Sequence, residues 1–186
     1  LDNKDNVGPK SISGKSEWRR KERKPATINE NHARELLELH TVSPKAAYTQ
    51  DDIIELAKIM TGWRPKWTKK KDHGHNVSFD TERHEPGKKT VFGKTYKRGK
   101  KSLEIAIKDL ANHPSCREFI ATKLCRYLIT DNPTKDMITP IIKAWEQSDG
   151  YLPEVHKAAI KVAFEYNDKY QKFQNPENWW LQVINM

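Results

Sequence analysis

The sequence of 186 residues has only two cysteines and no long apolar run. No apolar stretch approaches the roughly 20 residues that a membrane-spanning helix needs, so we expect no transmembrane segment in this chain. Cys116 and Cys125 are its only cysteines. On one helix their spacing places them about 180° apart, where they cannot form a disulfide with each other. We therefore predict two small buried thiols, and the redox compartment stays open.

Motifs of nucleophilic and nucleotide-dependent enzymes are also missing. The sequence has no G-x-S-x-G turn, no P-loop and no Gly-rich dinucleotide fingerprint. It begins at Leu1 with neither an initiator Met nor a signal peptide, so we expect a fragment or a processed form. A chain of this length suffices for one good core and does not demand two domains.

The positive charge is concentrated in one segment. Residues 64–101 hold 13 Lys and Arg against 4 Asp and Glu, which accounts for the whole net charge of +9. A local basic segment of this kind indicates a specific face for anions.

Apolar periodicity and capping residues predict a mainly α fold. Asn29 is a suitable N-cap for a helix over 29–41, and His40 falls in the middle of its apolar arc. Thr49 with Asp52 predicts a second, capping-box start. In all, six or seven helices are expected, at 29–41, 49–61, 103–111, 114–129, 137–145 and 155–166, and from Pro176 onward.

The remaining segments suggest how the chain is organised. Residues 1–28 have no apolar period and are expected to form an extended lead-in, with its mobility left open. Residues 29–186 would then form a single globular domain with a loop-rich or short β-hairpin insertion near 63–101. Within the insertion we expect short strands at 77–80 and 89–92, joined by the loop His84-Glu85-Pro86-Gly87.

Several motifs occur together in a fixed order. The segment 29–41 is followed by Tyr48-Thr49-Gln50-Asp51-Asp52 and Thr61-Gly62-Trp63, then by Phe79-Asp80, His84-Glu85-Pro86-Gly87, Leu110-Ala111-x-His113-Pro114, Phe119-Ile120-Ala121-Thr122-Lys123-Leu124 and Lys172-Phe173-x-x-Pro176. This order closely resembles the bacterial family catalogued as domain of unknown function 1800, over nearly the whole chain. The departures are His32, where the family more often has an apolar or aromatic residue, and Glu85, where it commonly has Asp.

The resemblance implies the C-terminal part of a longer protein, so the N-terminal remainder of the same polypeptide is the expected partner. Family members often look exported, which suggests a periplasmic, envelope or secreted location, and they are frequently encoded beside another uncharacterised family. The family has no established reaction, so the resemblance leaves the chemistry and the oligomeric state open.

A cluster of imidazoles and carboxylates within 14 residues is the first candidate site. Such groups are ligands for Zn²⁺ or another first-row divalent metal, although no H-E-x-x-H signature occurs. The alternative is a solvated loop in which His and Asp cap turns. The candidate metal ligands are Asp72, His73, His75, Asp80 and His84, with Glu85 beside them.

The helix at 29–41 is the second candidate. We expect a buried polar network there, in which Arg34 pairs with a carboxylate and His40 donates to a backbone carbonyl. A catalytic acid–base role is the alternative, with candidates Glu35, Glu38, His40, His84 and Glu85.

The basic segment is the third candidate. Its lysines lie among aromatic residues, a pattern found in polyanion binders. No helix-turn-helix, zinc-finger or RNA-recognition signature accompanies it, so nucleic acid is not favoured. The residues predicted to bind a polyanion are Lys69, Lys70, Lys71, Lys88, Lys89, Lys97 and Arg98.

We therefore predict a structural or ligand-binding part of an exported or envelope-associated protein. The alternatives are a metal-dependent, hydrolase-like enzyme built on the His, Asp and Glu cluster, and a polyanion-binding module. Whether the chain is an enzyme is left open.

Overall fold

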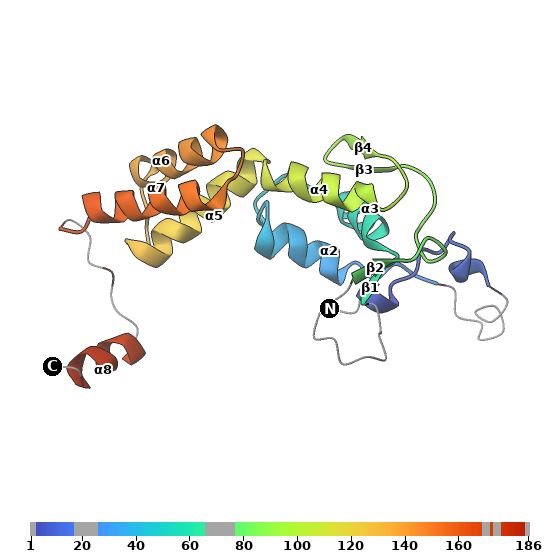
Figure 1. The fold of residues 1–186 in the computed structure, drawn as a ribbon, viewed down its shortest axis with the longest axis horizontal. Helices are drawn as coiled ribbons and strands as arrows, with labels where there is room; N and C mark the ends of the chain where they lie inside the picture. The colour runs from blue at the N-terminus through green and yellow to red at the C-terminus, as the bar shows by residue number, and fades with distance from the viewer. Residues whose placement is uncertain (1–2, 17–25, 66–76, 169–171, 173–175, 185–186) are drawn as a thin grey trace. The chain divides into compact units, whose positions relative to one another are not determined.

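The computed structural model describes residues 3–16, 26–65, 77–168, 172 and 176–184. These residues confirm the predicted mainly α fold, because six α-helices of nine or more residues accompany two small antiparallel strand pairs (Figure 1). Their contacts form two compact units, Leu1–Ala111 and Asn112–Met186, which are described separately below. The predicted division into a lead-in, 1–28, and one domain, 29–186, stays a prediction.

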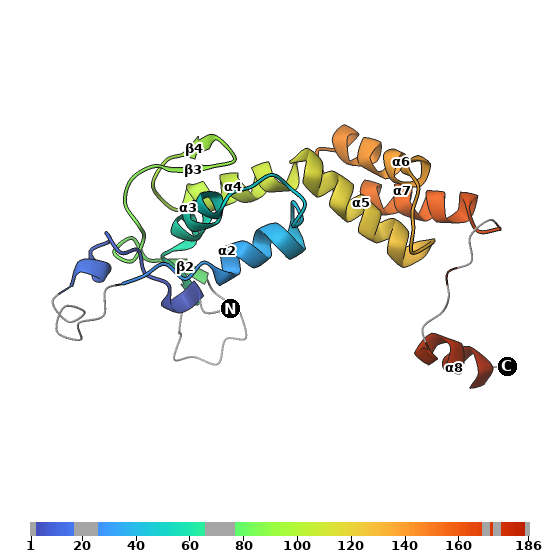
Figure 2. The same ribbon diagram turned by 180° about the vertical axis from the view of Figure 1, so that it is seen from behind.

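Unit 1 contains the helices α2 (Asn31–Glu35), α3 (Gln50–Met60) and α4 (Lys101–Ala111). The predicted capping box starts α3: the Thr49 side chain accepts from the Asp52 amide, and the Asp52 side chain accepts from the Thr49 amide. The apolar face of α3 is fully buried, with Ile53, Leu56 and Ile59 no more than 1% exposed. Helices α2 and α3 pack against each other, as the front and back views agree (Figures 1 and 2).

The predicted helix at 29–41 is present but changes its geometry halfway. Asn29 accepts from the Asn31 amide at 3.0 Å, and α2 continues into a π-helical turn over Leu36–His40. A π turn holds more residues than an α turn. Residues after Leu37 are therefore rotated away from the face that an α-helix would give them. Leu37 remains buried while His40 is exposed, so the prediction of a core-facing His40 was wrong.

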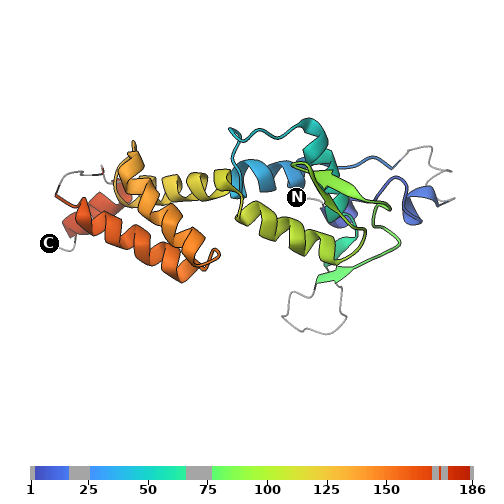
Figure 3. The same cartoon turned by 90° about the horizontal axis from the view of Figure 1, so that it is seen from above.

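Two hairpins replace the single strand pair implied by the sequence. Strand β1 (Trp63–Pro65) pairs with β2 (Val77–Phe79), and β3 (Lys89–Val91) pairs with β4 (Lys94–Tyr96) (Figure 3). The strands expected at 77–80 and 89–92 are thus present, but they do not pair with each other. The reason is the turn at Phe92-Gly93, where both residues have positive φ, 50° and 72°. A two-residue turn of that kind closes β3 directly onto β4.

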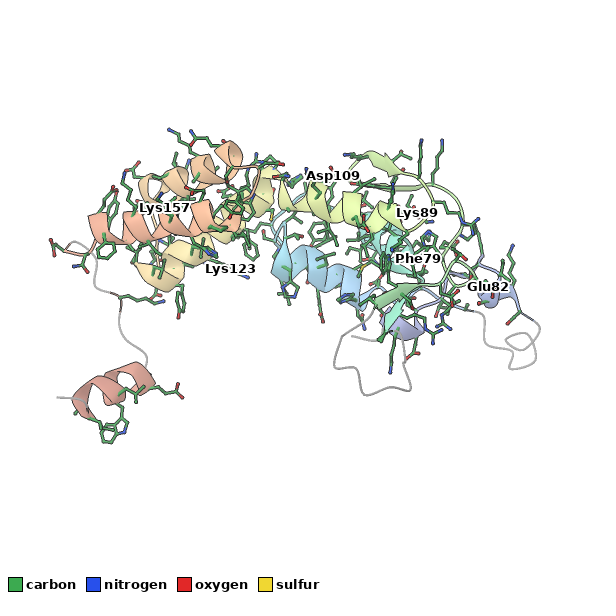
Figure 4. The ribbon with its side chains drawn as sticks, in the orientation of Figure 1. Phe79, Glu82, Lys89, Asp109, Lys123 and Lys157 are labelled. Carbon is green, nitrogen blue, oxygen red and sulfur yellow. The ribbon has the colours of Figure 1, made fainter. Side chains whose placement is uncertain are left out.

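The β3–β4 hairpin is fastened to two helices. The Asp52 carboxylate that caps α3 also accepts from the Phe92 amide at 2.7 Å. On α4, Asp109 accepts from Lys94 at 2.7 Å and from the Tyr96 hydroxyl at 2.9 Å (Figure 4). Burial and the Asp109 carboxylate raise the pKa of Tyr96 well above its ordinary value. These bonds fix which face of β3 points inward.

Residues 3–16, within the predicted lead-in, fold onto the rest of unit 1. They contain the 3₁₀ turns Asn3–Asp5 and Ser13–Lys15, and Val7 between them is 2% exposed. Asn6 and Asn29 are joined by a reciprocal pair of hydrogen bonds of 2.9 and 3.0 Å. This segment therefore reaches both the start of the opening helix and the candidate site.

Unit 2 is a helical unit of α5 (Pro114–Leu128), α6 (Lys135–Gln147), α7 (Leu152–Glu165) and α8 (Pro176–Ile184). The first three helices share a core that includes Cys125, Met137, Ile141 and Val155, each 0% exposed. Both cysteines are free and buried, as predicted, and burial raises the pKa of each thiol to about 11. No helix among the described residues is long and apolar enough to cross a membrane.

Candidate functional site

Among the buried polar residues of unit 1, four are joined by hydrogen bonds around one histidine: Thr61, His84, Glu85 and Lys89. We call them the His84 network. They are 0%, 1%, 4% and 1% exposed, and they lie just after α3, in the loop before β3 and at the first position of β3. Lys89 lies in the interior of the unit (Figure 4), and the ring of Phe79 packs on His84 with 5.0 Å between centroids. Buried polar groups are stable only when they are hydrogen-bonded, so their partners decide what the network does.

His84 has a defined tautomer. Its Nδ1 lies 2.9 Å from the backbone carbonyl of Thr61, which can only accept, so Nδ1 carries the proton. Nε2 is then the acceptor, and the Gly99 amide and the Lys89 Nζ lie 3.3 and 3.4 Å from it. Burial is the largest effect on His84 and lowers its pKa. The hydrogen bond to Thr61 raises the pKa and partly offsets burial, while the positive charges of Lys89 and Arg98 lower the pKa further. The imidazole is therefore neutral near pH 7.

Lys89 uses all three protons of its ammonium group. Its Nζ donates to the carbonyls of Glu85 and Gly87, the latter at 3.0 Å, and the third acceptor is His84 Nε2. Burial lowers the pKa of Lys89 to about 8, although the charges of Glu85 and Glu55 act in the opposite direction. A side chain held in this way cannot contact a polyanion, so the prediction that placed Lys89 on a binding surface was wrong.

The inward direction of Lys89 follows from strand geometry. Alternate residues of a strand face opposite sides, and in β3 Lys89 and Val91 are buried while Thr90 is exposed. The Thr90 amide lies 3.3 Å from the Glu55 carboxylate of α3, which holds the strand against that helix.

Glu85 joins the network to the N-terminal segment. One of its carboxylate oxygens accepts from the Lys10 amide at 2.9 Å, while its own amide donates to the Thr61 hydroxyl at 2.8 Å. The same segment makes two more hydrogen bonds to the residues just before Glu85. The Gly8 amide donates to the carbonyl of Arg83, and the Ser13 amide donates to the carbonyl of Glu82, both at 2.9 Å.

Gly8 makes this close approach sterically feasible. A Cβ added to Gly8 would lie 2.5 Å from Glu85 Cα and 2.6 Å from the Glu85 carboxylate. Two of the atoms it would meet belong to the Glu85 backbone, which cannot move aside as a flexible side chain can. Only glycine therefore fits here without displacing the segment.

The opening helix carries a separate, partly exposed network. Arg34 donates to Glu30 at 2.6 Å and to Gln50 at 2.7 Å, and lies 3.4 Å from Glu38. The Tyr48 hydroxyl reaches the same Glu38 oxygen at 3.3 Å, and burial followed by the Glu38 charge raises the pKa of Tyr48. The predicted pairing of Arg34 with a carboxylate is confirmed. This network is not a core network, because its ionic side chains remain about one-third exposed.

The catalytic candidates are not brought together. The Glu38 carboxylate accepts hydrogen bonds from Arg34 and Tyr48. Glu35 is half-buried, and His40 is exposed. His84 and Glu85 instead belong to the buried network. A donation from His40 to a backbone carbonyl within the core is ruled out by its exposed position.

Of the predicted metal ligands, Asp72, His73 and His75 lie outside the described residues. Asp80 accepts from the Glu82 amide at 3.0 Å and lies 3.7 Å from Arg64, while both ring nitrogens of His84 are engaged elsewhere. Within the described ranges, no three His, Cys, Asp or Glu side chains are grouped to hold a metal. The metal site stays a prediction.

The predicted polyanion surface is only partly described. Lys88, Lys97 and Arg98 are exposed around the β3–β4 hairpin, and Lys100 lies 5.7 Å from the centre of the Trp63 ring. Lys69, Lys70 and Lys71 lie outside the described residues. Polyanion binding therefore also stays a prediction.

Sequence reasoning missed three members of the arrangement: Thr61, Gly8 and the inward Lys89. The available signal for Lys89 was its spacing of two from the apolar Val91 in a predicted strand. Thr61 was recognised only as a helix end. Nothing in the sequence indicated that Gly8 would meet residues about 75 positions later, because that contact depends on tertiary structure.

Comparison with known proteins gives the family but no activity. The family described as "Protein of unknown function (DUF1800)" matches residues 1–186, the whole chain, and the protein belongs to this family. Neither a curated protein nor a solved structure matches the chain.

Proposed function

We propose that the chain is a structural part of a larger protein, in which the His84 network clamps the N-terminal segment onto the loop before β3. The observation that carries this proposal is the set of bonds at His84 and Lys89. Both ring nitrogens and all three ammonium protons are directed to partners within the chain. A catalytic acid, base or nucleophile must instead reach a reacting atom of the substrate.

The Glu85 carboxylate is directed to the chain as well. It accepts from the Lys10 amide, and the buried Thr61 hydroxyl donates to Lys58 O at 2.7 Å while accepting from the Glu85 amide. A buried network whose members are bonded in this way contributes rigidity and a unique arrangement of the segments it joins. An exported or envelope-associated location is part of the proposal and rests on the family resemblance alone.

His84→Leu tests the structural role. The substitution removes one hydrogen-bond partner from each of three groups: the Thr61 carbonyl, the Gly99 amide and the Lys89 ammonium group. Because an unsatisfied buried group costs about 1–3 kcal/mol, we expect a loss of about 3 kcal/mol or more in the free energy of unfolding. Urea unfolding monitored by circular dichroism measures this loss.

His40→Leu is the matched control, since His40 is an exposed histidine in the same unit. Its effect should stay within about 0.5 kcal/mol. If His84→Leu were as stable as the natural chain, the structural proposal would fail, because residues retained for activity are often removable without loss of stability.

A further inference from the structure

Unit 2 leaves large apolar side chains exposed where two of its helices end. In the last turns of α7, Ile160 and Phe164 are 50% and 76% exposed, and in the last turn of α5, Tyr127 and Leu128 are 77% and 40% exposed. Helices α5 and α7 contact each other and end on the same side of the unit, as two views agree (Figures 1 and 3). Both ends also contribute to the shared core, for example Ile129 and Val162.

Helix α8 has an apolar face of its own. Trp180, Val183 and Ile184 follow the i, i+3, i+4 spacing that places residues on one side of a helix. They are 58%, 45% and 61% exposed. A helix of nine residues is too short to be stable alone in water, so α8 requires packing to persist.

Lys172, four residues before the start of α8, contacts the end of α5. Lys172 donates to the carbonyls of Arg126 and Tyr127 at 2.5 and 3.1 Å, and its Nζ lies 5.5 Å from the centre of the Tyr127 ring. These carbonyls belong to the last turn of a helix, which has no intrahelical donors for them. Lys172 thus fixes the chain at the exposed end of α5.

This attachment limits where α8 can go. Pro176 follows Lys172 by four residues, which span at most about 14 Å when extended. The helix itself is about 14 Å long, while Ile160 and Phe164 lie about 6 Å apart along α7. We propose that α8 docks on the exposed apolar side chains near the end of α7, with Trp180, Val183 and Ile184 directed toward Ile160 and Phe164.

Hydrogen–deuterium exchange of the full chain, resolved by peptide mass spectrometry, tests this docking. Amides of α8 should exchange at least about 10-fold more slowly than the same sequence unfolded, because an undocked helix of this length is open most of the time. The double variant Ile160→Ser with Phe164→Ser should abolish the protection. Both side chains are exposed, so α5–α7 should keep their own protection.

The control is Lys161→Ser with Glu165→Ser, an exposed pair at the same spacing that lies about 100° around α7 from Ile160 and Phe164. It should leave the protection of α8 unchanged. Unprotected α8 amides in the natural chain would overturn the proposal, as would protection that survives the Ile160 and Phe164 substitutions. Protection that increases with protein concentration, with a dimer mass by light scattering, would assign the surface to a second copy and also overturn it.

Discussion

Lys89 allows the proposed clamp to be tested by pH alone. Its pKa is about 8 in the folded chain against an ordinary value of 10.5. Between these values the unfolded state binds more protons than the folded state, so the contribution of Lys89 to stability rises with pH. At about 1.4 kcal/mol per pKa unit, the rise between pH 7 and pH 9.5 amounts to about 2 kcal/mol.

The measurement must separate Lys89 from groups with the opposite effect. The thiols of Cys116 and Cys125 have ordinary pKa values of 9.0 that are raised to about 11 by burial. Since they ionise first in the unfolded chain, they remove stability as the pH rises above 9. We therefore compare the natural chain with Lys89→Met, because the thiol contributions are common to both.

The stability difference between the natural chain and Lys89→Met should increase by about 2 kcal/mol from pH 7 to pH 9.5 in urea unfolding experiments. Lys88→Met is the control, because Lys88 is the exposed neighbour and should leave the slope unchanged. A difference that does not change with pH would refute the reasoning, since it would mean that Lys89 titrates in the folded chain as it does in water.

Three further outcomes follow from the described contacts. Gly8→Ala should displace the segment around the buried Val7, cost about 2–4 kcal/mol and make that segment more sensitive to limited proteolysis. Below pH 6.5 the unfolded chain protonates His84 before the folded chain does, so stability falls with acid; His84→Leu should reduce this slope in urea unfolding between pH 7 and pH 5. Arg34→Met should cost no more than about 1 kcal/mol by thermal unfolding, because the partly exposed ion pairs of Arg34 are screened by water.

The helices could be predicted because their signals are local. Periodic apolar residues and the Thr49–Asp52 capping box define α3, and Pro114 marks the start of α5. The exposed His40 could not be predicted, because periodicity assumes α-helical geometry throughout. A π turn is a small change in hydrogen bonding, and one such turn rotates every residue that follows.

The candidate site was harder to predict because its residues are far apart in the sequence. His84 and Glu85 were predicted as site residues because of their side-chain chemistry. Their partners Thr61, Lys89 and Gly99 come close to them only when α3 and the β3–β4 hairpin have folded. The sequence also suggested a surface role for Lys89, since lysine is seldom buried. Its burial becomes understandable only when three acceptors are found around its ammonium group.

The composition of unit 1 explains why a polar network would serve as a clamp. The N-terminal segment buries only one large apolar side chain, Val7, among its described residues 3–16, so apolar packing alone offers it little preference for one position. Hydrogen bonds from Gly8, Lys10 and Ser13 to residues 82–85 are directional and fix one register. The loop that receives them is itself held from the other side by Thr61 and Lys89. Removing a member on either side should therefore loosen the same segment.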